Sequence, residues 1–207
     1  MSVPTAAPRL TRKGEATRRR LLDAAAAELA ARGTAEVSSV AAGAGVAPSV
    51  LYRYFDGKDG LIAAVVHDFY DQYDAEVFQA PIQLESSWSD RETERLRREI
   101  GFLYSHPLGR VIAAGLLHEA AATRADAERQ RRHTEAAARN IRHGQRAGEV
   151  AIGIDAGLAG AATIGALRAL LGEALSRTPP VPQDDLFDAI QRIGVALLIG
   201  PEAESQE

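Results

Sequence analysis

Residues 37–61 read VSSVAAGAGVAPSVLYRYFDGKDGL, and this stretch decides the fold of the N-terminal part of the chain. Val37, Val40 and Ala41 have the spacing of one helix face, and Gly45 allows a tight turn after them. Pro48 is favoured in the first turn of a helix, because the N–H that it lacks has no intrahelical partner there. The stretch therefore predicts a short helix, a tight turn and a second helix that begins at Pro48 and ends near Phe55.

A further helix is expected before this pair. Leu22, Ala25, Ala26 and Leu29 form one apolar helix face, and Gly33 is a natural end for it. Three short helices that end in a tightly turned pair are typical of a helix-turn-helix unit, whose last helix presents its N-terminal side chains to DNA. On spacing alone, a generic pair of packed helices is an equal alternative.

The rest of the chain also has helical periodicity, and no segment alternates convincingly between apolar and polar residues. Prolines and glycines separate the periodic segments, as expected for loops. Helices are predicted over residues 58–79, 90–105, 107–123, 126–146, 155–176 and 184–199. The fold class that follows is all-α, with about nine helices.

Composition excludes several classes of protein. The chain has 207 residues and 46% hydrophobic content, so it can bury a large core without disulfides or metals. It has no cysteine, which excludes disulfide frameworks, thiol catalysis, cysteine-ligated zinc and iron–sulfur clusters. The longest mostly apolar run, residues 156–167, falls short of the roughly 20 residues that span a bilayer, so we expect a cytoplasmic protein without a membrane span.

Charge is distributed unevenly along the chain. Residues 1–60 carry a net charge of +3, whereas the remaining 147 residues carry −7. A basic N-terminal part on an acidic body suggests a local surface for a polyanion such as nucleic acid. A solvated basic tail explains the charge equally well.

The segment Leu51-Tyr52-Arg53-Tyr54-Phe55, followed by Lys58, makes the assignment specific. Together with residues 37–50, it strongly resembles the signature of the tetracycline-repressor (TetR) family of transcriptional regulators. Residues 21–33 resemble the first helix of that family, and the length and helix order also fit. The resemblance implies a helix-turn-helix DNA-binding domain over residues 11–57 and an effector-binding and dimerisation domain over residues 58–200, between a mobile basic arm (1–10) and a mobile tail (201–207).

The resemblance also implies which side chains contact a double-stranded DNA operator. Phosphate contacts position such a protein, and base contacts give sequence specificity. We expect base contacts from Ser38, Pro48, Ser49, Val50 and Arg53, and backbone contacts from Thr17, Ser39, Tyr52, Tyr54 and Lys58. Leu51 and Phe55 are expected in the core.

Two departures from the family pattern weaken the contacts expected at the start of the second helix. The loop after Gly33 is shorter than usual, and Glu36 stands where a threonine or serine normally caps that helix. An acidic residue there suits the helix dipole but repels phosphate.

The C-terminal body is expected to form a homodimer and to bind a small, mainly apolar effector. Small residues recurring every four positions, followed by an apolar stripe on the last helix, predict the dimer interface: Gly157, Ala161, Gly165, Ala169, Leu186, Ile190, Ile193 and Leu197. Packing within the subunit is the alternative for each face. The predicted effector pocket is lined by Phe78, Trp88, Phe102, Tyr104, His106, Leu117, His118 and Arg168. Arg168 interrupts an apolar helix and would need a carboxylate or an anionic ligand as its partner.

An enzyme and a pure ligand sensor are the rival classes. The chain has no Glu-x-x-His pair of a di-iron bundle, and His118-Glu119 lacks the second histidine of a zincin motif. We therefore expect neither catalysis nor a metal nor a cofactor. A sensor dimer without specific DNA binding would have little reason to group Tyr52, Tyr54 and Lys58. The expected function is a ligand-released repressor on a palindromic operator, and 22 arginines against 2 lysines hint at a GC-rich bacterial genome.

Overall fold

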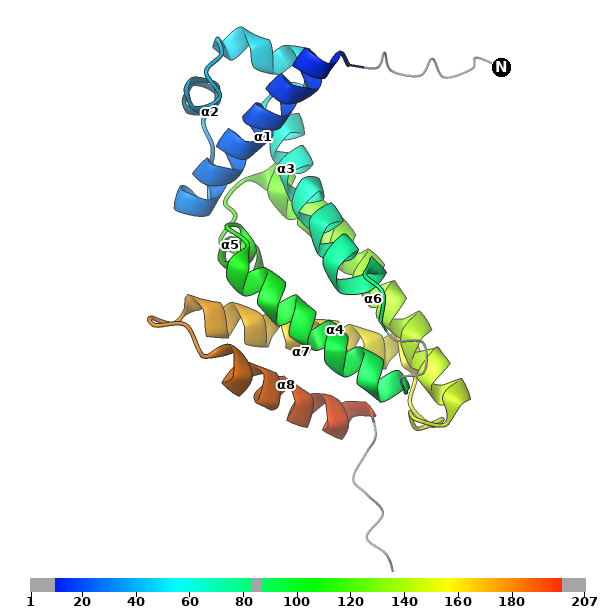
Figure 1. Cartoon of the computed structure of the whole chain (residues 1–207). Coiled ribbons are helices and arrows are strands. Elements are labelled where there is room, and N and C mark those ends of the chain that lie inside the picture. The colour runs from blue at the N-terminus through cyan, green and yellow to red at the C-terminus, as the bar shows by residue number, and fades with distance from the viewer. Residues whose placement is uncertain (1–9, 83–86, 199–207) are drawn as a thin grey trace, which may run out of the picture.

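The structure is a computed structural model that describes residues 10–82 and 87–198, apart from the side chains of residues 195–197 (Figure 1). The N-terminal part consists of α1 (Arg12–Arg32), α2 (Val37–Gly43) and a 3-10 helix, η1 (Pro48–Arg53). The body consists of α3 (Gly57–Tyr73), which continues as a π-helix, η2 (Asp74–Gln79), then α4 (Trp88–Ser105), α5 (Gly109–Ala113), α6 (Ala120–Ala147), α7 (Ala156–Ser176) and α8 (Gln183–Leu198). The all-α prediction is confirmed. The expected arm (1–10, except Leu10) and tail (201–207) lie outside the described residues.

Local sequence explains where the longer helices begin and end. The hydroxyl of Thr11 accepts the N–H of Gly14 at the start of α1, and Gly33 ends that helix in the left-handed conformation. Ser87 and Asp90 form a reciprocal capping box at the start of α4. Asp155 accepts the N–H of Leu158 and so caps α7.

One continuous apolar core joins the N-terminal helices to the body. It runs from Leu29 on α1 through Leu61 and Phe69 on α3 to Leu171 on α7, all of them 2% exposed or less. Helices α3 and α6 lie side by side along most of their length (Figure 1). Helix α3 packs against α1 of the N-terminal part and against α6 of the body, and so connects the two parts.

The predicted helix over residues 107–123 is wrong. Helix α5 ends at Ala113, Gly115 has a φ of +65°, and α6 begins at Ala120 with Glu119 as its N-cap. A positive φ interrupts a right-handed helix, and glycine is the residue that adopts it without strain. Residues 120–123, which were predicted to end the helix over residues 107–123, therefore belong to α6.

Gly109, at the first position of α5, packs against the end of α4 too closely for any side chain. A Cβ atom at Gly109 would lie 1.9 Å from the carbonyl oxygen of Leu103. We expect Gly109→Ala to lower the free energy of unfolding by about 3 kcal/mol, because backbone must move. Gly101→Ala is the matched control, since nothing lies within 4 Å of a Cβ there and alanine favours the helix. Thermal unfolding should show a large fall for the first variant and a small rise for the second; equal effects would contradict the close packing.

Helix α7 leaves much of its apolar surface uncovered. By length and composition alone it could cross a membrane, and 33% of its most apolar window is buried in this structure. Its small residues Gly157, Ala161, Gly165 and Ala169 are all exposed, and Leu158 is 75% exposed.

Candidate DNA-binding surface and effector cavity

Helices α2 and η1 form a tightly turned pair. The turn runs through Gly45, which has a φ of +65°, and the N–H of Val46 donates to the carbonyl of Ala41 at 3.0 Å. Val40 and Leu51 are fully buried, and so hold the two elements on the core. The second element is a 3-10 helix rather than the expected α-helix, and its bounds match the predicted position.

The outer face of η1 carries the side chains that were predicted to meet DNA. Pro48, Ser49 and Arg53 are exposed, and Tyr52 is 63% exposed, whereas Val50 and Tyr54 are half-buried. Leu51 and Phe55 are buried, as expected from their apolar character. The arrangement presents hydroxyl and guanidinium donors outward from a rigid core, which suits phosphate and base recognition.

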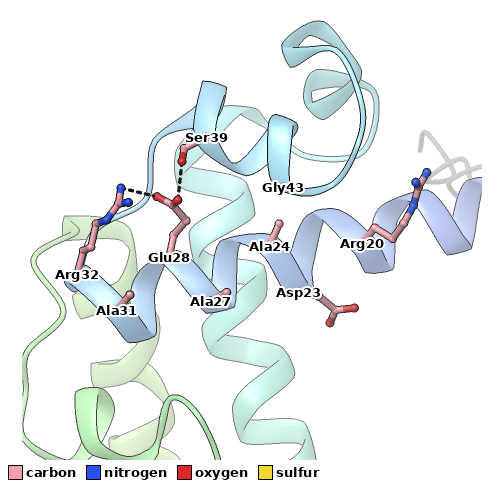
Figure 2. Close-up of a pocket in the computed structure, with 9 residues that line it drawn as sticks. All are labelled: Arg20, Asp23, Ala24, Ala27, Glu28, Ala31, Arg32, Ser39 and Gly43. Atoms are coloured by element: carbon pink, nitrogen blue, oxygen red, sulfur yellow. Dashed lines mark hydrogen bonds and ion pairs between the residues drawn. The ribbon is translucent and has the colours of Figure 1, made fainter.

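Two of the predicted backbone contacts are already engaged within the protein. Thr17 is buried, and its hydroxyl donates to the carbonyl of Lys13 at 3.0 Å. Figure 2 shows Ser39, on α2, donating to the carboxylate of Glu28, on α1, beside an open groove between the two helices; Glu28 also pairs with Arg32 one turn along α1. Thr17 and Ser39 are therefore poor candidates for phosphate contacts, whereas Ser38 is exposed.

Lys58, a predicted phosphate contact, is held by two carboxylates. Its Nζ lies 3.0 Å from Glu119 Oε1 and 3.5 Å from Glu36 Oε1. The hydrogen bond to Glu119 is the main cause of the raised pKa of Lys58. Glu36 makes no side-chain cap at the start of α2, so its carboxylate is directed to Lys58 instead. DNA would have to compete with both carboxylates for this ammonium group.

Glu119 also joins the DNA-binding part to the body. Its Oε1 accepts the N–H of Ala35 at 3.2 Å, and the N–H of His118 donates to the carbonyl of Gly33 at 3.0 Å. A Cβ atom at Gly33 would lie 2.4 Å from the carbonyl oxygen of Leu116. The sequence analysis did not predict this contact between the end of α1 and the start of α6, although it named His118, the residue directly before Glu119, as a candidate site residue.

A cavity of about 340 Å³ lies between α4, α6, α7 and α8, next to the end of η2. Its walls are mainly apolar, with residues such as Leu96, Ile141, Leu167 and Leu170. Phe78 and Trp88 line it, which agrees with the predicted pocket for two of its eight residues. Trp88 is fixed there, because its Nε1–H donates to the carbonyl of Asn140 at 3.1 Å.

The other predicted pocket residues lie elsewhere. Phe102 and His106 pack with Phe69 in an aromatic cluster, with ring centroids 4.9–5.4 Å apart, and burial lowers the pKa of His106. The Tyr104 hydroxyl donates to the carbonyl of Val181 at 2.6 Å. Leu117 packs against the core, and His118 belongs to the contact with Gly33. These side chains therefore have partners within the protein and do not line this cavity.

Arg168 has the carboxylate partner that its burial requires. It pairs with Asp126 on α6, which also accepts the hydroxyl of Tyr70. Arg168 borders a small void of about 40 Å³ next to the cavity, rather than the cavity itself. An anionic ligand is thus not needed to neutralise this guanidinium.

Glu99, on α4, is the polar residue of the cavity that the sequence interpretation missed. It borders both the cavity and the small void, and it accepts a hydrogen bond from the Tyr73 hydroxyl. Burial raises its pKa to about 7, while Tyr73 and His133 act in the opposite direction. The signal was available, because Glu99 stands three positions after Leu96 and four before Leu103, on the apolar face of its helix.

The predicted dimer face divides between surface and core. Leu186 is 3% exposed in the core of the subunit, which leaves little of its side chain for an interface. Ile190 is half-buried and lines the cavity, whereas Ile193 is 39% exposed. The side chain of Leu197 lies outside the described residues.

The N-terminal part matches a known family of regulators. Residues 21–65 match the family model described as bacterial regulatory proteins, tetR family. No curated protein sequence matches the chain. The matched segment includes the tightly turned pair, Tyr52, Tyr54 and Lys58, and the start of α3.

Solved structures of the same fold extend the similarity over the whole chain. A putative TetR-family transcriptional regulator from Rhodococcus sp. is 24% identical, with a TM-score of 0.71 over 88% of this chain and 99% of its own. One from Syntrophomonas wolfei is 15% identical, with a TM-score of 0.77 over 92% and 99%. The transcriptional regulator FadR from Bacillus subtilis, solved in complex with stearoyl-CoA, is 17% identical, with a TM-score of 0.72 over 89% and 99%. The N-terminal domain thus matches the tetR family of bacterial regulatory proteins, and the whole chain shares the fold of solved TetR-family regulators.

Proposed function

We propose that this protein is a repressor that binds a palindromic operator as a homodimer and releases it when a small, mainly apolar effector fills the cavity. The course of α3 is the observation that carries the proposal. Lys58 stands in its first turn beside the DNA-binding surface, and Tyr73 in its last turn bonds to Glu99 at the cavity. Phe78, on the π-helix that continues α3, lines the cavity directly. One helix thus contacts both sites.

The exposed ridge of α7 supports the homodimer. A Cβ atom at Gly165 would have no neighbour within 4 Å, so this face is open to close approach by another helix. A two-fold dimer buries such a self-complementary surface and presents two recognition elements. For binding to successive major grooves, these elements must be about 34–36 Å apart.

Linkage explains how the effector would release DNA. An effector that favours an arrangement with wrongly spaced η1 elements weakens DNA binding by some factor. Bound DNA must then weaken effector binding by the same factor. A typical coupling of about 1–3 kcal/mol gives changes of about 5- to 150-fold. The stearoyl-CoA complex of the Bacillus subtilis FadR structure supports a ligand site on this fold.

Selection of random DNA duplexes on the purified protein, at two salt concentrations, tests this function. We expect enrichment of a palindrome, and an affinity that falls steeply with salt, because phosphate contacts release counterions. A folded dimer that enriches no sequence, even after extraction of small molecules, would instead indicate a ligand sensor without specific DNA binding. Tyr52, Arg53 and Ser49, exposed on the outer face of η1, favour the first outcome.

A further inference from the structure

The charged side chains around the cavity are paired with one another, except for Glu99. Each guanidinium that borders the cavity or the adjoining void has a carboxylate of its own: Arg95 pairs with Glu92, and Arg168 pairs with Asp126. Among the described ion pairs none contains Glu99. Its carboxyl group therefore has no ion-pair partner among the described residues, and the nearby His133 is the one group whose positive charge acts on its pKa.

The titratable groups around Glu99 come from α3, α4, α6 and α7, and each cation among them already faces another carboxylate. Tyr73, on α3, donates its hydroxyl to Glu99. His133, on α6, lines the cavity, and its Nε2 lies 2.9 Å from Asp74 Oδ1. Arg168, on α7, is taken by Asp126, and Arg95, on α4 itself, is taken by Glu92. A carboxylate in such surroundings costs free energy unless it takes up a proton, as its raised pKa allows, or a ligand brings a positive charge.

From this geometry we infer that the effector is a cationic amphiphile: a basic nitrogen placed against Glu99, with an apolar body along α7 and α8. The aromatic rings of Phe78 and Trp88 favour the same class, because a cation is attracted to the face of an aromatic ring. The apolar walls formed by Ile164, Leu167 and Leu170 would cover the body. This inference deepens the proposed function by naming the chemical class of its effector.

Three probes with one apolar body test the class directly: phenylbutylamine, phenylbutanol and phenylbutyrate. Trp88 is the only tryptophan of the chain and lines the cavity, so its fluorescence reports binding without a label. We expect the amine to bind at least about tenfold more tightly than the alcohol at pH 8, and the carboxylate to bind most weakly. Equal affinities, a preference for phenylbutyrate, or failure of the amine to bind would each overturn the inference.

Glu99→Gln identifies the residue responsible. It should remove the preference for the amine while leaving the affinity for phenylbutanol unchanged, since the amide keeps the shape and loses the charge. Glu92→Gln is the matched control, because this carboxylate also lines the cavity but already pairs with Arg95. An amine preference that survives in Glu99→Gln would overturn the assignment.

The pH dependence of the wild-type protein gives a second test that needs no variant. The pKa of Glu99 is raised to about 7, so its charged fraction increases as the pH rises from 6 to 8. The probe amine stays protonated throughout this range, so its advantage over the alcohol should grow with pH. A ratio of the two affinities that is independent of pH would contradict the role of Glu99.

Failure of this inference can be told apart from failure of the proposed function. A protein that enriches a palindrome but prefers no amine is a DNA-binding regulator with an effector of another class. A protein that prefers the amine through Glu99 but enriches no DNA retains the cavity chemistry without the proposed repression.

Discussion

The combined variant Tyr52→Phe, Tyr54→Phe and Lys58→Ala is expected to bind its operator at least about 2,000-fold more weakly than the wild type. Hydrogen bonds to charged groups contribute about 1.5–3 kcal/mol each, so two hydroxyls and one ammonium amount to at least about 4.5 kcal/mol. Tyr52 is 63% exposed, so loss of its hydroxyl leaves no buried group unpaired. Fluorescence anisotropy with the selected palindrome would measure the loss.

The controls for this variant separate DNA contacts from folding and from net charge. Arg131→Ala removes one positive charge from the exposed surface of α6, far along the chain from η1, and should change the affinity little. The triple variant should remain dimeric by sedimentation. Unchanged operator affinity would show that these three side chains do not contact phosphate. Dissociation of the dimer would show instead that Lys58 acts mainly through its bond to Glu119, 3.0 Å away.

The DNA-binding surface was predictable because its residues are adjacent in the sequence. Residues 37–58 contain the short helix, the turn at Gly45 and the exposed donors, so the pattern and its spacing are read directly. The sequence could not show which of the predicted DNA-contacting side chains bond to other groups within the protein. The partners of Ser39 and Lys58 are Glu28 and Glu119, 11 and 61 positions away, and only the packing of α1, α2 and α6 brings them together.

The effector cavity was mostly unpredictable for the same reason. Its walls come from four helices and the end of η2, so no local pattern marks them. Aromatic and histidine side chains were the natural candidates, but Phe102 and His106 are buried in a cluster with Phe69. The apolar face of α4 contained the informative exception, Glu99, whose position between apolar neighbours indicates burial and thus an unusual role.

Arg129→Leu is expected to have the largest effect on stability, because Arg129 holds α6 against α3 and η2. Its guanidinium, in a side chain that is 11% exposed, pairs with Asp71 and with Asp74 at 3.2 Å. Removing one partner of a buried pair leaves carboxylates without compensation, which costs about 3–5 kcal/mol. The midpoint of urea unfolding should fall accordingly.

Arg132→Leu, three residues along the same helix, is the matched control for Arg129→Leu. Arg132 is 59% exposed and pairs only with Glu128 one turn away, a type of surface pair that contributes about 0.5 kcal/mol. Adding Asp74→Asn to Arg129→Leu should recover part of the lost stability, because it removes a carboxylate that the first change leaves with His133 as its one remaining described partner. Additive losses would contradict this coupling. Such coupling would mean that the carboxylates of α3 and η2 depend on Arg129 of α6 for charge compensation. A movement of α6 on effector binding would then displace α3 as well, because Arg129 links the two helices. The displacement of α3 would reach Lys58, which stands in its first turn.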